Sequence, residues 1–313
     1  MAKKIKKKIN MAKFFINEGI WHIELDGLSK LKSRTIRFVQ LVIVTLKNCS
    51  HTKVGVQSMS LSYLCTLAIV PLLAVMMVIT DGFGLENYLS TYLTDSFGNN
   101  ETVVFILDRT SVFLDYAQSS WAGLISSMTL VWIVIRMMFN VEGCFDLVWK
   151  VDKGRSFIKK IAYDLVILIL SPFVVMIFFY APIVNTRIFA LIGFTAEQFP
   201  FLTSFTGFLL IYTIVAFTMT AMYKYIPNTE VKYHNAWRAA FPAALVFCIF
   251  QFVYIESQSA VSKWNAVYGA MAAVPLFMLW LNMSWQIILY GAEVSYALQT
   301  VDTYREPDND KLD

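Results

Sequence analysis

The chain has 313 residues, of which 57% are hydrophobic and 15% are charged, and its formal net charge is +4. This composition is too apolar for a water-soluble protein of that length, so it excludes the soluble classes and indicates a membrane protein. A helix rises about 1.5 Å per residue, so about twenty apolar residues cross a hydrocarbon layer of about 30 Å.

Residues 1–57 are predicted to form a basic, amphipathic region on the cytoplasmic surface of the membrane. They begin with five lysines within residues 3–8, which either bind anionic lipid head groups or form a tail that only fixes the topology. No apolar segment of the signal-peptide type follows these lysines. Interleaved apolar and charged residues over 14–32 predict a surface helix, and 35–46 is interpreted as a second, interfacial helix.

Six continuously apolar runs follow, and they predict six transmembrane helices rather than barrel strands, whose residues would alternate. The expected fold is therefore an all-α polytopic membrane protein, a six-helix bundle within a domain at 58–298. An acidic cytoplasmic tail is expected at 299–313. The predicted spans are 58–79, 119–139, 161–184, 205–223, 239–255 and 267–297.

Charges in the connections predict the orientation, because Lys and Arg are retained on the cytoplasmic side. Twelve Lys and Arg precede the first span against three acidic residues, whereas the connection at 80–118 carries six acidic residues and one Arg. The first region should lie inside and the connection outside, with both termini in the cytoplasm. The length and apolar content of 80–118 predict an extracytoplasmic helical cap, which either acts as a lid, only covers helix ends, or contacts envelope proteins.

Residues that could support enzymatic chemistry are sparse. The cysteines show no metal-ligand or disulfide spacing, and the three histidines stand far apart without acidic neighbours. The chain has no phosphate-binding glycine-rich loop, no nucleophile elbow and no recognisable nucleic-acid-binding module. We therefore expect a protein that is not an enzyme, with no catalytic residue, no metal and no cofactor. The four cysteines are Cys49, Cys65, Cys144 and Cys248.

The last predicted span carries a polar stripe. Asn282, Gln286 and Glu293 lie with Pro275 within about 40° of one another on a helical wheel of 3.6 residues per turn. Polar groups are costly in lipid and usually face a bundle interior or a water-filled cavity. We expect this stripe to line a substrate-binding cavity.

Two further charged residues lie near the cytoplasmic ends of predicted spans. Arg136 is near the end of the second span and Asp164 near the start of the third. We expect Arg136 to pair with Asp164 or with Glu293 and to complete a polar cavity open to the cytoplasm or the inner leaflet. The alternative is that all three are interfacial, with Arg136 reaching lipid head groups and Glu293 already in water.

Several short sequence runs resemble the YihY/BrkB family of bacterial inner-membrane proteins. The resemblance covers roughly residues 38–298 and is most specific in the runs at 223–228, 267–270, 279–281 and 291–293, with a looser match around 61–71. The chain departs from the family at 238–239, where Pro-Gly is common, and at 264–265. The residues that carry the resemblance as structural motif positions are Tyr63, Pro71, Pro227, Asn228, Tyr268, Gly269, Trp280 and Gly291.

The resemblance implies a six-helix inner-membrane protein with both termini in the cytoplasm, and a transporter with links to the cell envelope and lipid movement. Together with the polar stripe and Arg136, it leads us to expect transport or translocation of an amphipathic, anionic lipid or other envelope-linked substrate. It also brings the older name ribonuclease BN, which these residues do not support. A different class of function is a non-catalytic membrane scaffold that holds an envelope assembly through 80–118. A continuous polar groove between helices would favour transport, whereas a tightly packed bundle with a large apolar outer patch would favour the scaffold.

Overall fold

The computed structural model describes residues 29–82, 108, 112, 121–191, 198–262 and 266–301. Within these ranges it describes all side chains except those at 30, 75–82, 121–127, 130, 179, 182, 258–262 and 266–274. The lysine run and most of the predicted surface helix at 14–32 therefore lie outside the described residues. So do nearly all of the predicted cap at 80–118 and all but the first three residues of the predicted tail at 299–313.

All the regular secondary structure in the described part of the chain is helical, with no strand, as the continuous apolar runs predicted. Helix α2 precedes six long helices, and each of those six contains most or all of one predicted span. The helices are α2 (Lys30–Thr52), α3 (Val54–Gly82), α6 (Trp121–Val148), α7 (Phe157–Leu191), α8 (Pro200–Tyr225), α9 (Tyr233–Ser262) and α10 (Ala266–Thr300).

Within the described residues, four helical segments are long and apolar enough to cross a membrane by length and composition. They are Val54–Ala74, Phe157–Phe178, Pro200–Tyr225 and Tyr233–Ser257. The all-helical membrane class is thus confirmed. A bundle of six transmembrane helices, which adds α6 and α10 to these four, stays a prediction.

The apolar side chains of α7 and α8 point outward. Leu170 and Ile177 on α7 are each 54% exposed, and Phe217 on α8 is 60% exposed. Water would disfavour such surfaces, whereas lipid accommodates them without cost because its tails are equally apolar. The outward faces of these helices are therefore suited to contact with lipid.

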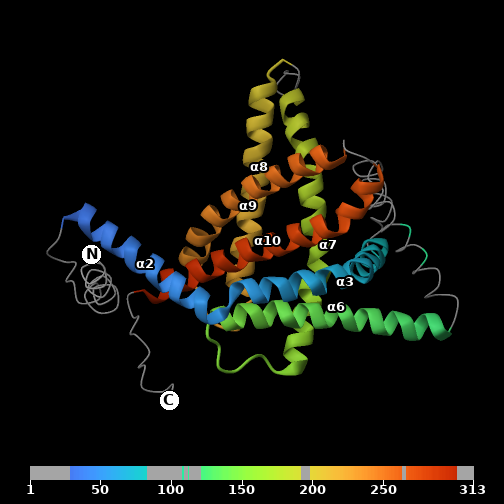
Figure 1. Ribbon diagram of the computed structural model, residues 1–313, viewed down its shortest axis with the longest axis horizontal. Coiled ribbons are helices and arrows are strands. Elements are labelled where there is room, and N and C mark those ends of the chain that lie inside the picture. Colours follow the sequence, from blue (N-terminus) through green and yellow to red (C-terminus); the bar gives the residue numbers. More distant parts are fainter. Residues whose placement is uncertain are drawn as a thin grey trace, which may run out of the picture.

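The helices pack in a cyclic order of neighbours. Helix α3 packs between α6 and α10. From α10 the order continues through α9 and α8 to α7, and α7 in turn contacts α3 and α6. Figure 1 shows α7 and α8 standing side by side as a hairpin, across the direction of α3 and α6. Helix α2 leads into α3 through Lys53, which has a left-handed backbone (φ 49°), and also packs against α10.

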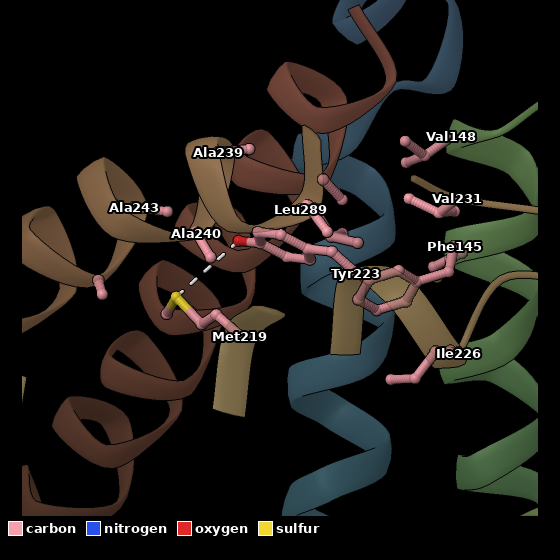
Figure 2. Close-up of a cluster of buried hydrophobic side chains, with 14 of the residues drawn as sticks. Phe145, Val148, Met219, Tyr223, Ile226, Val231, Ala239, Ala240, Ala243 and Leu289 are labelled. Carbon is pink, nitrogen blue, oxygen red and sulfur yellow. Dashed lines mark hydrogen bonds between the residues drawn. The ribbon is translucent and has the colours of Figure 1, made fainter. Parts of the chain in front are cut away.

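Tyr223 of α8 lies at the centre of the largest buried cluster and has no exposed surface. Its hydroxyl donates to the Met219 sulfur at 3.9 Å, and Figure 2 shows the ring between Phe145, Leu289 and the alanines of α9. Small residues allow helices to approach closely in membranes. Alanines supply them on α9 at positions 236, 239, 240, 243 and 244, all of them buried.

Gly291 of α10 is where a helix backbone meets the Tyr223 ring. A Cβ atom built on Gly291 would lie 2.8 Å from Tyr223 Cζ and from Ala243 Cβ, and closer still to Tyr223 Oη. Carbon atoms normally pack about 3.5–4.0 Å apart. Only glycine fits here, which gives a packing reason for Gly291 among the motif residues.

Other motif residues have different surroundings. Trp280 donates its indole N–H to Gln251 Oε1 at 2.7 Å and stacks on Tyr254, with ring centroids 5.7 Å apart. Pro71 is buried within α3, whereas Tyr63 is 56% exposed. The side chains of residues 268 and 269, which the sequence analysis named, lie outside the described residues.

Candidate functional site

The polar stripe of α10 faces the start of α3. Asn282 donates through Nδ2 to Ser58 Oγ at 3.4 Å, and Gln286 donates through Nε2 to Asn282 Oδ1 at 2.8 Å. Ser58 is fully buried. Side chains one turn apart on α10 therefore satisfy one another, and the stripe is an internal polar contact between α10 and α3. Pro275 of the same helix is exposed.

Glu293 continues the stripe towards the end of α10 and has no exposed surface. Its Oε1 accepts a hydrogen bond from Thr52 Oγ1 at 2.5 Å, and its Oε2 accepts one from Asn48 Nδ2. Asn48 Nδ2 also donates to the Val148 carbonyl at 3.2 Å. The carboxyl group thus joins α10 to the last turn of α2 and to the end of α6, and it is buried rather than in water.

Helix α2 turns its polar face towards this site. Gln40, Asn48 and Thr52 are buried and are separated by multiples of four residues, which places them on one face. Phe38 and Leu46 on the other faces are each 64% exposed. The sequence analysis missed Asn48 and Thr52 because it treated 35–46 only as an interfacial segment. The spacing of Gln40, Asn48 and Thr52 was the signal that could have found them.

Arg136 does not contact the two carboxylates that the sequence analysis offered as partners. Its side chain is exposed on α6, near Trp132, which is 53% exposed one turn earlier. Among the described residues, no ion pair joins Arg136 to Asp164 or to Glu293. Of the five predicted site residues, Asn282, Gln286 and Glu293 lie on one face of α10, whereas Arg136 lies on an exposed surface of α6.

The cation that organises the predicted cytoplasmic end is Arg155, in the connection between α6 and α7. Its Nη1 donates to Glu142 Oε1 at 3.1 Å and to the Ile226 carbonyl at 3.0 Å. Its Nη2 donates to the carbonyls of Tyr225 and Pro227. A guanidinium has a rigid fork of donors that suits such simultaneous contacts. Arg155 therefore ties the ends of α6 and α8 together.

Glu142 is the carboxylate at the centre of this end. It is 2% exposed and pairs with Lys160 Nζ at 3.2 Å as well as with Arg155. Asp164 lies one turn beyond Lys160 on α7, is 6% exposed, and has an Oδ2 atom without a hydrogen-bond partner. The sequence analysis named Asp164 but not Glu142, because residue 142 follows the end of the predicted span.

The run at 223–228 now has a structural reason. Tyr223 fills the core, and the Pro227 carbonyl accepts a hydrogen bond from Arg155. The Asn228 backbone N–H donates to Asp146 Oδ1 at 2.7 Å, and its side chain donates to the Lys153 carbonyl at 2.9 Å. The motif therefore docks the end of α8 onto the connection between α6 and α7.

A shallow depression of about 470 Å³ lies beside this docked end. Lys224 is a cation on its wall, and its ammonium donates to the Val231 carbonyl and lies 5.3 Å from the Tyr233 ring centroid. Arg155 is also on the wall, but four acceptors already surround its terminal nitrogens. The depression is lined by Arg155, Tyr163, Lys224, Tyr225, Pro227, Asn228, Thr229 and Glu230.

Within the described residues, no three His, Cys, Asp or Glu side chains are grouped so as to hold a metal. The long apolar helices and the internal polar contacts define a polytopic α-helical membrane protein. Residues 45–312 match the family described as Virulence factor BrkB. The chain belongs to this family, as the resemblance in its sequence predicted.

Curated relatives agree with this assignment. The chain is 28% identical to a UPF0761 membrane protein of Actinobacillus pleuropneumoniae serotype 5b over 286 residues, which is 88% of this chain and 97% of the relative. It is 30% identical to a UPF0761 membrane protein of Mannheimia succiniciproducens over 249 residues, 76% of this chain and 82% of the relative. No solved structure matches the chain. These names establish a membrane protein and give no activity.

Proposed function

We propose that this protein translocates an amphipathic, anionic envelope substrate, such as a lipid, across the bacterial inner membrane. The observation that carries the proposal is the line of polar side chains on α10, in which Asn282 and Gln286 are partly buried and Glu293 is fully buried. Asn282 contacts α3 and Glu293 contacts α2. Polar groups within a membrane-spanning helix are costly in lipid, and they usually face a bundle interior or a water-filled cavity. A head group that passed along this line would meet amide and hydroxyl groups instead of hydrocarbon.

In this proposal, the described conformation would be a closed state of the pathway. Asn282, Gln286 and Glu293 bond to one another or to Ser58, Asn48 and Thr52. A substrate could reach them only after α2 or α3 moves away from α10. Helix α2 is suited to such a movement, because it has a sharp backbone bend at Lys53 and exposed apolar side chains that can slide within lipid.

Exposed cations would recruit the head group in this proposal. Arg136 is exposed on α6 near the end that the charge pattern assigns to the cytoplasm. Guanidinium groups bind phosphate and carboxylate well because two parallel N–H donors match two acceptor oxygens. With both termini in the cytoplasm, Arg136 would face the head groups of the inner leaflet.

A membrane scaffold is the second candidate, and the closed packing of the polar line favours it. The exposed apolar surfaces of α7 and α8 would then contact a partner rather than lipid. A scaffold would need no pathway and no selectivity for a head group. The two functions therefore differ in whether a particular lipid is retained and moved.

The test is native mass spectrometry of the protein released from membranes, followed by flux assays in liposomes. We expect the parent to retain an anionic lipid, and Arg136→Ala to retain less of it. Arg187→Ala is the matched control. Arg187 is also an exposed cation, but it lies near the C-terminal end of α7, which the charge pattern assigns to the outer side of the membrane. Equal lipid retention in all three proteins, with no flux above empty liposomes, would reject translocation and support the scaffold.

A further inference from the structure

The last turn of α2 and the end of α6 meet α10 at Glu293. The negative charge of a carboxylate at this point would have no positive group among the described residues in direct contact with it. The carboxyl group has no exposed surface, and its two hydrogen-bond donors, Thr52 and Asn48, are both neutral. An ionised carboxylate is expensive to bury without a positive partner. Lys150 acts on it only through the longer-range field, since its ammonium is engaged over the Tyr296 ring, 5.4 Å from the centroid.

Helix dipoles add to the negative potential at this point. Helix α2 ends at Thr52 and α6 ends at Val148, so both present their C-terminal carbonyls here. The C-terminal end of a helix carries about half a negative charge and favours cations. Two such ends beside a buried carboxylate would repel it unless the carboxylate takes up a proton or a cation is bound beside it.

A second observation points to a ligand. Asn48 is 3% exposed, its Nδ2 is used twice as a donor, and its Oδ1 is buried without any hydrogen-bond partner. Buried acceptors in proteins are nearly always satisfied. The amide group whose nitrogen meets Glu293 therefore leaves its oxygen as an unused ligand atom, in a site that already has excess negative potential.

We propose that Glu293, Asn48 and Thr52 form a binding site for one small monovalent cation, Na⁺. The donor set consists of carboxylate, amide and hydroxyl oxygens, with the Val148 carbonyl alongside, and hard cations select oxygen ligands. A single formal negative charge fits a monovalent ion better than a divalent one. Helix C-terminal ends and free carbonyls are also the groups that hold Na⁺ in many transporters. The proposal does not depend on what the protein moves.

The site also links the cation to helix α2. Both Asn48 and Thr52 belong to the last turn of α2, and Glu293 belongs to α10. Bound Na⁺ would hold α2 against α10, and its loss would leave α2 next to an unpaired carboxylate. The expected consequence is that Na⁺ stabilises the packing of α2.

The experiment is thermal unfolding of the purified full-length protein in detergent at constant ionic strength, with Na⁺ exchanged for K⁺ or choline. Ligand binding to the folded state stabilises it by mass action, so the melting temperature should rise with the logarithm of the Na⁺ concentration once that concentration exceeds the dissociation constant. At ten times the dissociation constant the rise should be about 3 °C. No difference between Na⁺ and choline in the parent would overturn the proposal.

Two variants and their matched controls localise the effect. Glu293→Gln should abolish the response to Na⁺, whereas Glu230→Gln, at an exposed acid in the connection before α9, should keep it. If Glu293→Gln does not fold, Thr52→Val decides, and it should raise the Na⁺ concentration at which the melting temperature begins to rise. Its control is Thr66→Val on α3, where the hydroxyl donates to the Ser62 carbonyl at 2.8 Å. The same Na⁺ dependence in Thr52→Val as in the parent would also overturn the site.

Repeating the titration at several pH values separates Na⁺ from a proton. The ionisable groups that face Glu293 are Lys150, after α6, and the Cys49 thiol, on α2. The melting temperature of the parent could instead be independent of Na⁺ and depend on pH. If Glu293→Gln then removed the pH dependence, Glu293 would hold a proton and not Na⁺. That outcome would reject the Na⁺ site, and it would not bear on lipid retention by Arg136.

Discussion

Gly291→Ala should destabilise the protein, because it places a methyl group where Tyr223 and Ala243 already lie. The new Cβ would be 2.8 Å from Tyr223 Cζ and from Ala243 Cβ, about 0.7 Å inside the usual carbon contact distance. Neither neighbour can yield easily, since Tyr223 is fully buried between α6, α9 and α10. Overpacking of this kind costs about 1–3 kcal/mol, so we expect a lower free energy of unfolding by about that amount.

Tyr223→Phe provides a test of the mechanism. The hydroxyl is the atom closest to the added Cβ, and its own bond to the Met219 sulfur is long, at 3.9 Å. Tyr223→Phe alone should therefore cost little, and it should relieve part of the Gly291→Ala defect. In a double-mutant cycle we expect a favourable coupling of about 1 kcal/mol between the two changes.

The assay is equilibrium unfolding in mixed detergent micelles, read by tryptophan fluorescence. The matched control is Gly143→Ala on α6, where an added Cβ meets nothing within 4 Å. Alanine favours helix by about 0.5–1 kcal/mol over glycine, so this control should be neutral or stabilising. If Gly291→Ala unfolded like Gly143→Ala, the close approach of α10 to Tyr223 would be wrong.

Two further predictions concern the end of the bundle near the connection between α6 and α7. Arg155→Lys should lower the free energy of unfolding by about 2 kcal/mol, because an ammonium cannot serve Glu142 and three carbonyls together. Arg136→Lys, at an exposed position, should change stability by less than about 0.5 kcal/mol, and equal losses in the two variants would contradict this reading. Burial raises the pKa of the Cys144 thiol to about 11, so this thiol stays protonated at neutral pH. Maleimide should label it slowly until detergent unfolds the chain or the pH approaches that value, and fast labelling of the folded protein at pH 7 would show that Cys144 is not buried.

The positions of the long helices could be predicted because each contains a continuous apolar run. Their ends could not, because hydropathy reports where lipid would end and not where the helix ends. Helix α6 continues to Val148, past the predicted limit at 139, since Glu142 and Asp146 find partners within the fold: Arg155 and Lys160 for the first, and the Asn228 backbone for the second. Charges that looked like a connection in the sequence belong to a helix.

The helical wheel could place Asn282, Gln286 and Glu293 on one face, because their relation depends only on the helix period. The partners of Glu293 could not be predicted in the same way. Asn48 lies 245 positions earlier in the chain, and its approach depends on how α2 packs against α10. For Arg136 the sequence suggested partners that the packing does not supply. Its position near the end of the predicted second span suggested a pair with Asp164 or Glu293, but neither carboxylate contacts it.

Arg155 also determines which parts of the molecule can move relative to one another. Its contacts fix the end of α6 and the end of α8 to the connection that begins α7. A swing of α7 relative to α8 would therefore have to pivot at Arg155, because the two helices are joined there. The amplitude of such a swing would be greatest at the far tip of the hairpin, the end on which the charge pattern predicts the outer surface of the membrane.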